Sequence, residues 1–234
     1  MTQKQKDVVI GMILGDAYLQ KTGKQNARLR LEHSSDQKEY LEWKVSLLQN
    51  YFQTKILFLE RTNAIWKKTY HYVRIQSTAS PEFGKLQRLF YKESQKIIPK
   101  TITTFFKNPL SLAVWFMDDG YYYLRDRIAY LYIPNLDEDG RGYLLDALKN
   151  NFKLLPVLKQ KKRGFVLIFS VTETQKLMDI IKKFIIPSMR YKISLDPVST
   201  ERNLVPYGTG ESSEMVRQPA DHHTPYPRVI GVKI

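Results

Sequence analysis

Two periods of hydrophobic residues run along this chain. Between residues 36 and 52, apolar side chains recur at helical spacing, and Asp36 is a candidate N-cap for that helix. Residues 27–32 alternate between apolar and charged positions, which is typical of a strand with one buried face. A chain that mixes both periods indicates an α+β fold, with helices packed on one face of a sheet.

The predicted elements occur twice in the same order: helix, two strands, helix, two strands, helix. Residues 4–15 and 109–118 predict a buried helix at the start of each series, and Asn108, Pro109 and Gly120 are suited to bound the second one. Residues 166–170 of the second series are the predicted counterpart of residues 73–77 in the first. The sequence therefore predicts an N-terminal half at 1–106, a C-terminal half at 107–200 and an irregular tail, rich in proline and glycine, at 201–234.

The charge of the chain points to a polyanionic partner. Lysine and arginine number 37 against 23 acids, a formal charge of +14, and residues 201–234 contribute none of that excess. Such an excess on the folded part is typical of nucleic-acid binding. The chain has no cysteine, which excludes thiolate metal sites and cysteine nucleophiles. No apolar stretch is long enough to span a bilayer, so we expect no membrane association.

The two motif helices carry the candidate chemistry. Residues 9–17, VIGMILGDA, and residues 112–120, LAVWFMDDG, are apolar runs that end in a carboxylate. The partial negative charge at a helix C-terminus disfavours another anion, so two such placements suggest carboxylates directed at a common cation. Gly11 and Gly15 share one helix face, which favours close helix packing, and Ala113 serves the partner helix.

These motifs resemble the LAGLIDADG homing endonucleases of the single-chain, two-motif type, and most closely the intron-encoded mitochondrial enzymes. The resemblance covers roughly residues 5–195. It implies a pseudo-two-fold duplication of an αββαββα unit, with two saddle-shaped antiparallel sheets and the motif helices packed at the centre. Asp118 departs from the pattern because it stands where a small residue is usual, matching Gly15. Its alternative interpretation is a solvated acid or a cap partner at the helix end.

The resemblance also implies the site residues. Asp16 and Asp119 take the catalytic carboxylate position, and each is expected to bind Mg²⁺ (or Mn²⁺) together with a backbone carbonyl near Gly15 and near Asp118. Lys96 and Lys192 are expected to stabilise transition-state charge or orient water, although either could be a surface charge. Other candidates are His33 and His71, expected to be structural, Tyr121–Tyr123, expected to stack on DNA or fill the sheet, and His222-His223, a weak metal candidate.

The strands are expected to contact DNA bases in the major groove, with phosphate or solvent contact as the alternative. Alternation places Arg28, Arg30 and Glu32 on one face of a strand, with a similar set on the strand that includes Tyr72. The residues expected to bind DNA are Arg28, Arg30, Arg74, Gln76, Lys159, Lys161 and Arg163.

Three functions remain open from the sequence. The first is a site-specific double-strand DNA endonuclease for intron homing, a metal-dependent hydrolase that leaves short 3′ overhangs on a long specific target. The second is an RNA-binding maturase that assists splicing of its host group I intron, and the third is a catalytically silent DNA-binding regulator. Because one chain supplies both halves, we expect a monomer. An organelle (mitochondrion or chloroplast) or a prokaryotic cytoplasm would suit it; the target sequence is not encoded in these patterns.

Overall fold

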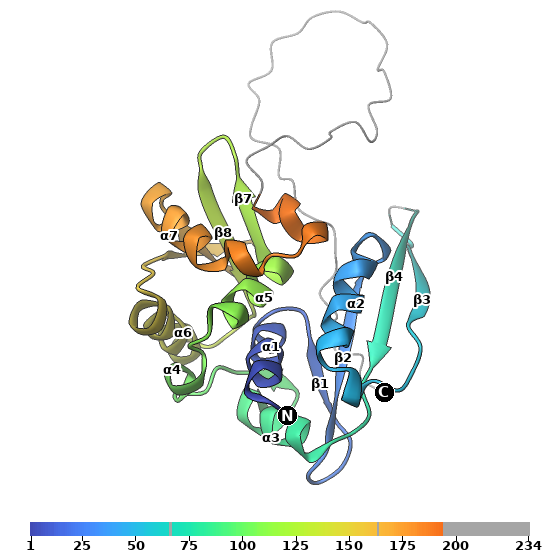
Figure 1. Ribbon diagram of the computed structural model, residues 1–234. Helices are drawn as coiled ribbons and strands as arrows, with labels where there is room; N and C mark the ends of the chain where they lie inside the picture. Colours follow the sequence, from blue (N-terminus) through green and yellow to red (C-terminus); the bar gives the residue numbers. More distant parts are fainter. Residues whose placement is uncertain (66, 163, 194–234) are drawn as a thin grey trace, which may run out of the picture. The chain divides into compact units, whose positions relative to one another are not determined.

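The computed structural model describes residues 1–65, 67–162 and 164–193 (Figure 1). Arg163 and the predicted tail at 201–234 lie outside the described residues. The first half holds the elements α1 (Gln3–Leu14), β1 (Tyr18–Lys21), β2 (Ala27–Ser34), α2 (Lys38–Leu47), β3 (Leu57–Asn63), β4 (Lys68–Gln76) and α3 (Pro81–Phe90). The four strands form one antiparallel sheet in the order β1-β2-β4-β3.

The second half repeats this arrangement. After the short elements β5 (Tyr91–Lys92), β6 (Gln95–Lys96) and α4 (Ile102–Phe105), the chain forms α5 (Pro109–Asp119), β7 (Gly120–Tyr123), β8 (Ile128–Ile133), α6 (Glu138–Phe152), β9 (Val157–Lys161), β10 (Gly164–Phe169) and α7 (Val171–Ile181). Its sheet has the order β7-β8-β10-β9, which is the same topology as the first sheet. The predicted α+β duplication is therefore confirmed.

Strand alternation determines which face of each sheet is buried. On β2, Leu29 and Leu31 are almost fully buried, while the charged residues between them are only partly covered. The helices of each half cover the apolar faces, as Figure 1 shows for α2 over β2 and for α7 beside β8. The opposite sheet faces carry the described residues among those expected to contact DNA.

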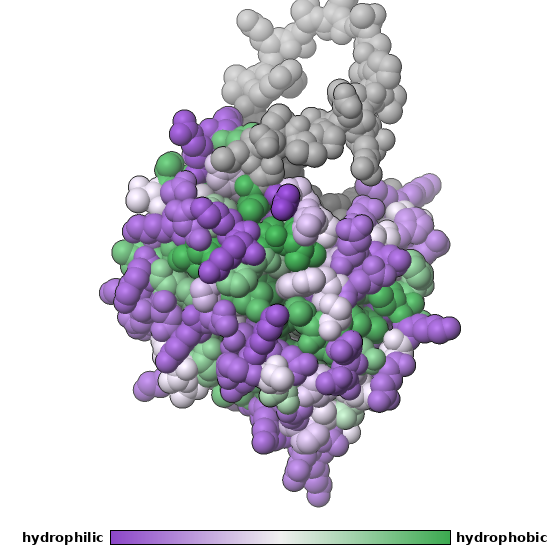
Figure 2. Space-filling view, viewed as in Figure 1, coloured by the Kyte–Doolittle hydropathy of each residue, from purple (hydrophilic) through white to green (hydrophobic). Residues whose placement is uncertain are grey.

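The helical side of the molecule is largely hydrophilic. Figure 2 shows hydrophilic side chains over most of this view, with hydrophobic patches between them. Within the described part of the chain, none of the helices combines the length and apolar character needed to cross a membrane.

The two motif helices, α1 and α5, pack against each other at the centre of the fold (Figure 1). Every residue from Val8 to Leu14 is buried, as is every residue from Leu110 to Asp118. A Cβ atom added at Gly11 would lie 2.4 Å from the carbonyl oxygen of Ser111 and 2.8 Å from Cβ of Val114. Since a glycine is needed for this backbone approach, the helix spacing follows directly from the motif.

The predicted start and C-cap of α5 are confirmed, and the helix ends at Asp119, one residue later than predicted. The Asn108 side chain accepts a hydrogen bond from the Leu110 N–H at 3.0 Å, Pro109 occupies the first turn, and Gly120 is the C-cap. The predicted cap of α2 was wrong: Asp36 lies inside a 3₁₀ turn, Ser35–Gln37, and α2 starts after it. α2 also ends at Leu47, with a second 3₁₀ turn at Gln49–Tyr51 in place of the expected continuous helix.

The predicted equivalence of residues 73–77 with residues 166–170 in the two halves was wrong by one residue. Gln76 pairs with Arg30 on β2, and Ile168 pairs with Tyr130 on β8. Arg30 lies opposite Tyr18 and Tyr130 lies opposite Tyr121, and each of these tyrosines is the first residue after its motif. Arg30 and Tyr130 are therefore equivalent, and so are their partners Gln76 and Ile168. A shift of one residue along a strand exchanges its two faces, so this register decides which side chains are equivalent.

We expect Gly11→Ala to destabilise the protein by about 1–3 kcal/mol, because the new methyl group would overpack the α1–α5 contact. The measurement is urea-induced unfolding. Gly142→Ala is the matched control: this exposed glycine of α6 has no described atom within 4 Å of an added Cβ, so the change should be neutral or stabilise by about 0.5–1 kcal/mol. Equal effects of the two substitutions would contradict the close packing.

Candidate active site

Each motif helix ends at an acid beside a lysine. Asp16 follows α1 and is exposed, and Asp119 is the last residue of α5 and is partly buried. Lys96 Nζ donates to the carbonyl oxygens of Gly15 at 2.8 Å and Ala17 at 3.4 Å. The two acids thus occupy the same position of the two motifs, although α1 ends two residues before Asp16 and α5 includes Asp119.

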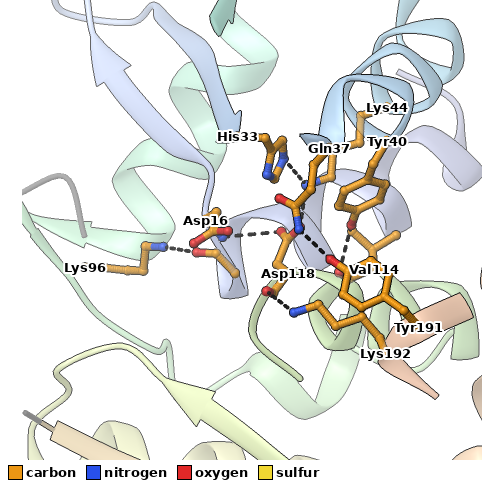
Figure 3. Close-up of polar contacts among 11 residues, drawn as sticks. Asp16, His33, Gln37, Tyr40, Lys44, Lys96, Val114, Asp118, Tyr191 and Lys192 are labelled. Carbon is orange, nitrogen blue, oxygen red and sulfur yellow. Dashed lines mark hydrogen bonds and ion pairs between the residues drawn. The ribbon is translucent and has the colours of Figure 1, made fainter. Parts of the chain in front are cut away.

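The second half repeats this contact. Lys192 Nζ donates to the carbonyl oxygens of Asp118 at 3.3 Å and Gly120 at 3.0 Å, which are the motif positions that correspond to Gly15 and Ala17. Figure 3 shows Lys96 and Lys192 approaching the helix ends from different segments. Two lysines far apart in the sequence therefore bind the carbonyls that flank the two motif acids.

The charges of the two helix ends act on a common region. Burial lowers the pKa of Lys192, while the carboxylates of Asp119, Asp16 and Asp118 oppose that shift in this order of strength. Asp16 and Asp119 also both raise the pKa of Tyr40, although burial and then Asp118 raise it more. Carboxylates from both halves therefore act on the same two side chains, Lys192 and Tyr40.

Asp118 is not the solvated acid that the alternative interpretation allowed. Its side chain is fully buried and forms an ion pair with Lys44 of α2, with Oδ1 2.6 Å from Nζ. Its other oxygen, Oδ2, accepts a hydrogen bond from the Asp16 N–H at 3.3 Å (Figure 3). A Cβ added at Gly15 would lie 2.4 Å from that oxygen, so the glycine of the first motif leaves the space that the acid of the second motif fills.

Lys44 is held by two further side chains. Its Nζ lies 2.9 Å from His33 Nε2 and 4.2 Å from the centre of the Tyr40 ring. Burial and then the Lys44 charge lower the pKa of His33 to about 3, so the ring is neutral and Nε2 accepts from the ammonium. The Tyr40 hydroxyl donates to the carbonyl of Val114 at 3.1 Å. His33 is therefore structural, as expected, within a buried polar cluster that joins the two halves.

Sequence reasoning did not identify Lys44. The signal was present, because Lys44 lies four residues after Tyr40 and three after Leu41 and so belongs to the buried stripe of α2. A lysine at such a position needs a buried acid, and Asp118 is the acid that stands where the motif usually has a small residue.

The described residues at the equivalent positions of the second half do not form such a polar cluster with the end of α1. Strand register places His33 at the position of Ile133, and the same separation along the chain places Lys44 at the position of Leu144. Both of these residues are buried and apolar. The first motif also has Gly15 where the second has Asp118. The two helix ends therefore differ chemically, although Lys96 and Lys192 make equivalent contacts with them.

The oxygens of the site suit a hard cation. Ligand atoms of Asp16, His33 and Asp118 lie within 4.8 Å of one another. However, Lys44 already contacts both His33 and Asp118, so these two side chains serve the ammonium. The carboxylates of Asp16 and Asp119 are hard oxygens of the kind that Mg²⁺ prefers, and so are the carbonyls of Gly15 and Asp118, which also accept from Lys96 and Lys192.

The residues expected to bind DNA lie on two sheets. Arg28 and Arg30 of β2 share the outer face of the first sheet with Arg74 and Gln76 of β4, and Arg28 Nη1 donates to Gln76 Oε1 at 3.4 Å. The remaining described members, Lys159 and Lys161, are exposed on β9 of the second sheet. The tyrosines at 121–123 all lie on β7, and His71 lies on β4.

A model of the LAGLIDADG DNA endonuclease family matches residues 6–177, which is most of the chain. The chain belongs to this family, as the motifs predicted. DNA endonuclease I-ChuI of Chlamydomonas applanata is 27% identical over 215 residues, covering 83% of this chain and 96% of the relative. The solved structure of the homing endonuclease I-WcaI bound to its DNA recognition sequence has 25% identity and a TM-score of 0.77, covering 83% of this chain and 88% of that one.

Other relatives are longer. Protein RecA of Mycobacterium shimoidei is 31% identical over 209 residues, which cover 82% of this chain but 47% of the relative. The chain therefore spans about half the length of the RecA proteins that it matches.

We expect Lys44→Met to cost about 3–5 kcal/mol of stability, because it leaves the Asp118 carboxylate buried without a partner charge. Adding Asp118→Ala to that variant should restore part of the loss, as a double-mutant cycle in chemical denaturation would measure. Lys38→Met is the control on the same helix: its exposed pair with Glu42 should contribute less than about 1 kcal/mol. A double variant no more stable than Lys44→Met would contradict the pairing.

Proposed function

We propose that this chain is a site-specific double-strand DNA endonuclease that initiates intron homing. The observation that carries the proposal is the pair of acid-ended helices at the centre of the fold, each with a lysine on the carbonyls beside its acid. The basic charge of the chain and the family to which it belongs support DNA as the substrate. Two sites of opposite orientation suit two strands of opposite polarity, with cleavage that leaves short 3′ overhangs.

A divalent ion, Mg²⁺ or Mn²⁺, fits the oxygens described above. When bound there, it supplies a nucleophilic water and neutralises the leaving oxygen of the phosphodiester. The residues that would hold it are Asp16 with the Gly15 carbonyl, and Asp119 with the Asp118 carbonyl. That donor set contains hard oxygens alone, which is the reason for proposing these ions.

The chain's own residues perform the remaining tasks. The ammonium groups of Lys96 and Lys192 place positive charge next to each acid, where the scissile phosphate gains negative charge. The Lys44–Asp118 pair fixes the end of α5 and, through the Asp16 N–H, the residue that follows α1. These contacts fix the backbone that carries both acids, and fixed geometry at the reacting groups favours catalysis.

Cleavage of the two strands is expected to depend on separate acids. Asp16→Asn or Asp119→Asn alone should convert supercoiled plasmid carrying the target to the nicked form, and the double variant should lower cleavage by at least about 10³-fold. DNA affinity, measured by gel shift, should remain within a few fold of the unsubstituted protein. The control is Asp179→Asn, an exposed acid of α7 paired with Lys182. Linear product from the double variant would refute the catalytic role of these acids.

Chelation separates the endonuclease from the maturase alternative. Removing divalent ions with EDTA should abolish cleavage and spare target binding, and added Mg²⁺ should restore cleavage. Two results together would favour the RNA-binding function. The unsubstituted protein would fail to cut bound target DNA with Mg²⁺ present, and the double Asn variant would still promote splicing of the host intron.

A further inference from the structure

The outer face of the first sheet holds an acid among arginines. Glu32 lies in the middle of β2, and its side chain is 9% exposed. Arg74 of β4 donates to Glu32 Oε2 through both Nε and Nη2, each at 2.6 Å. Arg61 of β3 contacts Oε1 at 2.7 Å, and Arg30 contacts Oε2 at 3.5 Å. Three strands thus direct guanidinium groups at one carboxylate.

A carboxylate on a surface that meets phosphates weakens binding unless its charge is compensated. Here three guanidinium groups surround one carboxylate, so the cluster keeps a net positive charge. Arg61 also lies over the Tyr72 ring, 4.7 Å from its centre. The acid therefore holds the arginine side chains in fixed directions. A phosphate contact does not require a fixed direction, whereas a base contact does.

The Arg74 guanidinium uses one edge for Glu32. The contact is made by the Nε–Nη2 edge, so this carboxylate does not occupy the Nη1–Nη2 edge, which can donate to a second acceptor pair. The O6 and N7 atoms of guanine accept this two-pronged donation in the major groove. An arginine already fixed at its other edge loses little conformational entropy when it binds a base.

Among the described residues, the second sheet lacks this chemistry at the positions equivalent to Glu32 and Arg74; the position equivalent to Arg61 is Arg163, which lies outside them. Strand register places Tyr132 where β2 has Glu32 and Val166 where β4 has Arg74. Tyr130 and Ile168 likewise replace Arg30 and Gln76. Its lysines, Lys159 and Lys161, lie on the edge strand β9 instead, opposite Val166 and Gly164. Tyrosine and aliphatic side chains suit thymine methyl groups, and lysines lack the fixed two-pronged geometry of a guanidinium, so they select guanine less strictly.

We propose that Glu32 is a specificity-determining residue that positions Arg74 and Arg61 to recognise guanine, so that only the half-site bound by the first sheet has a strict guanine requirement. This inference rests on the proposed DNA substrate. Arg74 is the residue that reads the base, and Glu32 acts through it.

The test is binding selection from a duplex library with a randomised segment, using the full chain in EDTA so that DNA is bound without cleavage. We expect one end of the selected site to contain an invariant guanine. Arg74→Ala should reduce that preference by about 5- to 150-fold, whereas the other end of the site keeps its profile.

Glu32→Gln distinguishes positioning from direct contact. Removing the negative charge should raise affinity for unrelated duplex DNA while lowering the guanine preference at the base pair that Arg74→Ala affects. The effects of the two substitutions should not add, because both act on one contact. The matched control is Tyr132→Phe at the equivalent position of the second sheet, which should leave the guanine preference at the first end unchanged.

Each outcome has a distinct meaning. A selected site without guanine at the affected end, or an unchanged profile for Arg74→Ala, would overturn this inference and leave the endonuclease proposal standing. If Glu32→Gln altered a different base pair, at a cytosine, Glu32 would be reading a base itself and the positioning role would be wrong. Failure to select any sequence would contradict the proposed substrate.

Discussion

The close approach of α1 and α5 is the constraint on which the rest of this structure depends. Gly11 allows the backbones to meet, and Gly15 leaves room for the carboxylate of Asp118. Because the helices touch along their length, their ends meet as well, and the acids that follow them reach one region. The packing also buries the Asp118 side chain, so its charge must find a partner within the protein.

Lys44 provides the partner charge for the buried Asp118 carboxylate. A buried ion pair adds little net stability, since the desolvation of both charges offsets their attraction. What it supplies is a unique arrangement, because α2 of one half can satisfy its lysine only against the end of α5 in the other. His33 and Tyr40 complete the surroundings of the ammonium, and the Asp16 N–H extends the network to the first motif.

The sequence predicted those features that depend on local pattern. Alternation identified β2 and its buried leucines, the apolar runs identified α1 and α5, and Asn108 and Pro109 located the start of α5. The prediction for Asp36 was wrong because a short 3₁₀ turn competed with the helix start. The partners of Lys44 and Glu32 depend on contacts across 74 residues or on strand register, and no local pattern specifies these.

The unequal helix ends determine how the halves can be combined. In a symmetric pair of N-terminal halves, each Lys44 would face the glycine that corresponds to Asp118 in the intact chain, which strands two ammonium groups in an apolar interior. A symmetric pair of C-terminal halves would bury two carboxylates opposite Leu144. Neither half can therefore associate with its own copy at low cost, so each half is complementary to the other and not to itself.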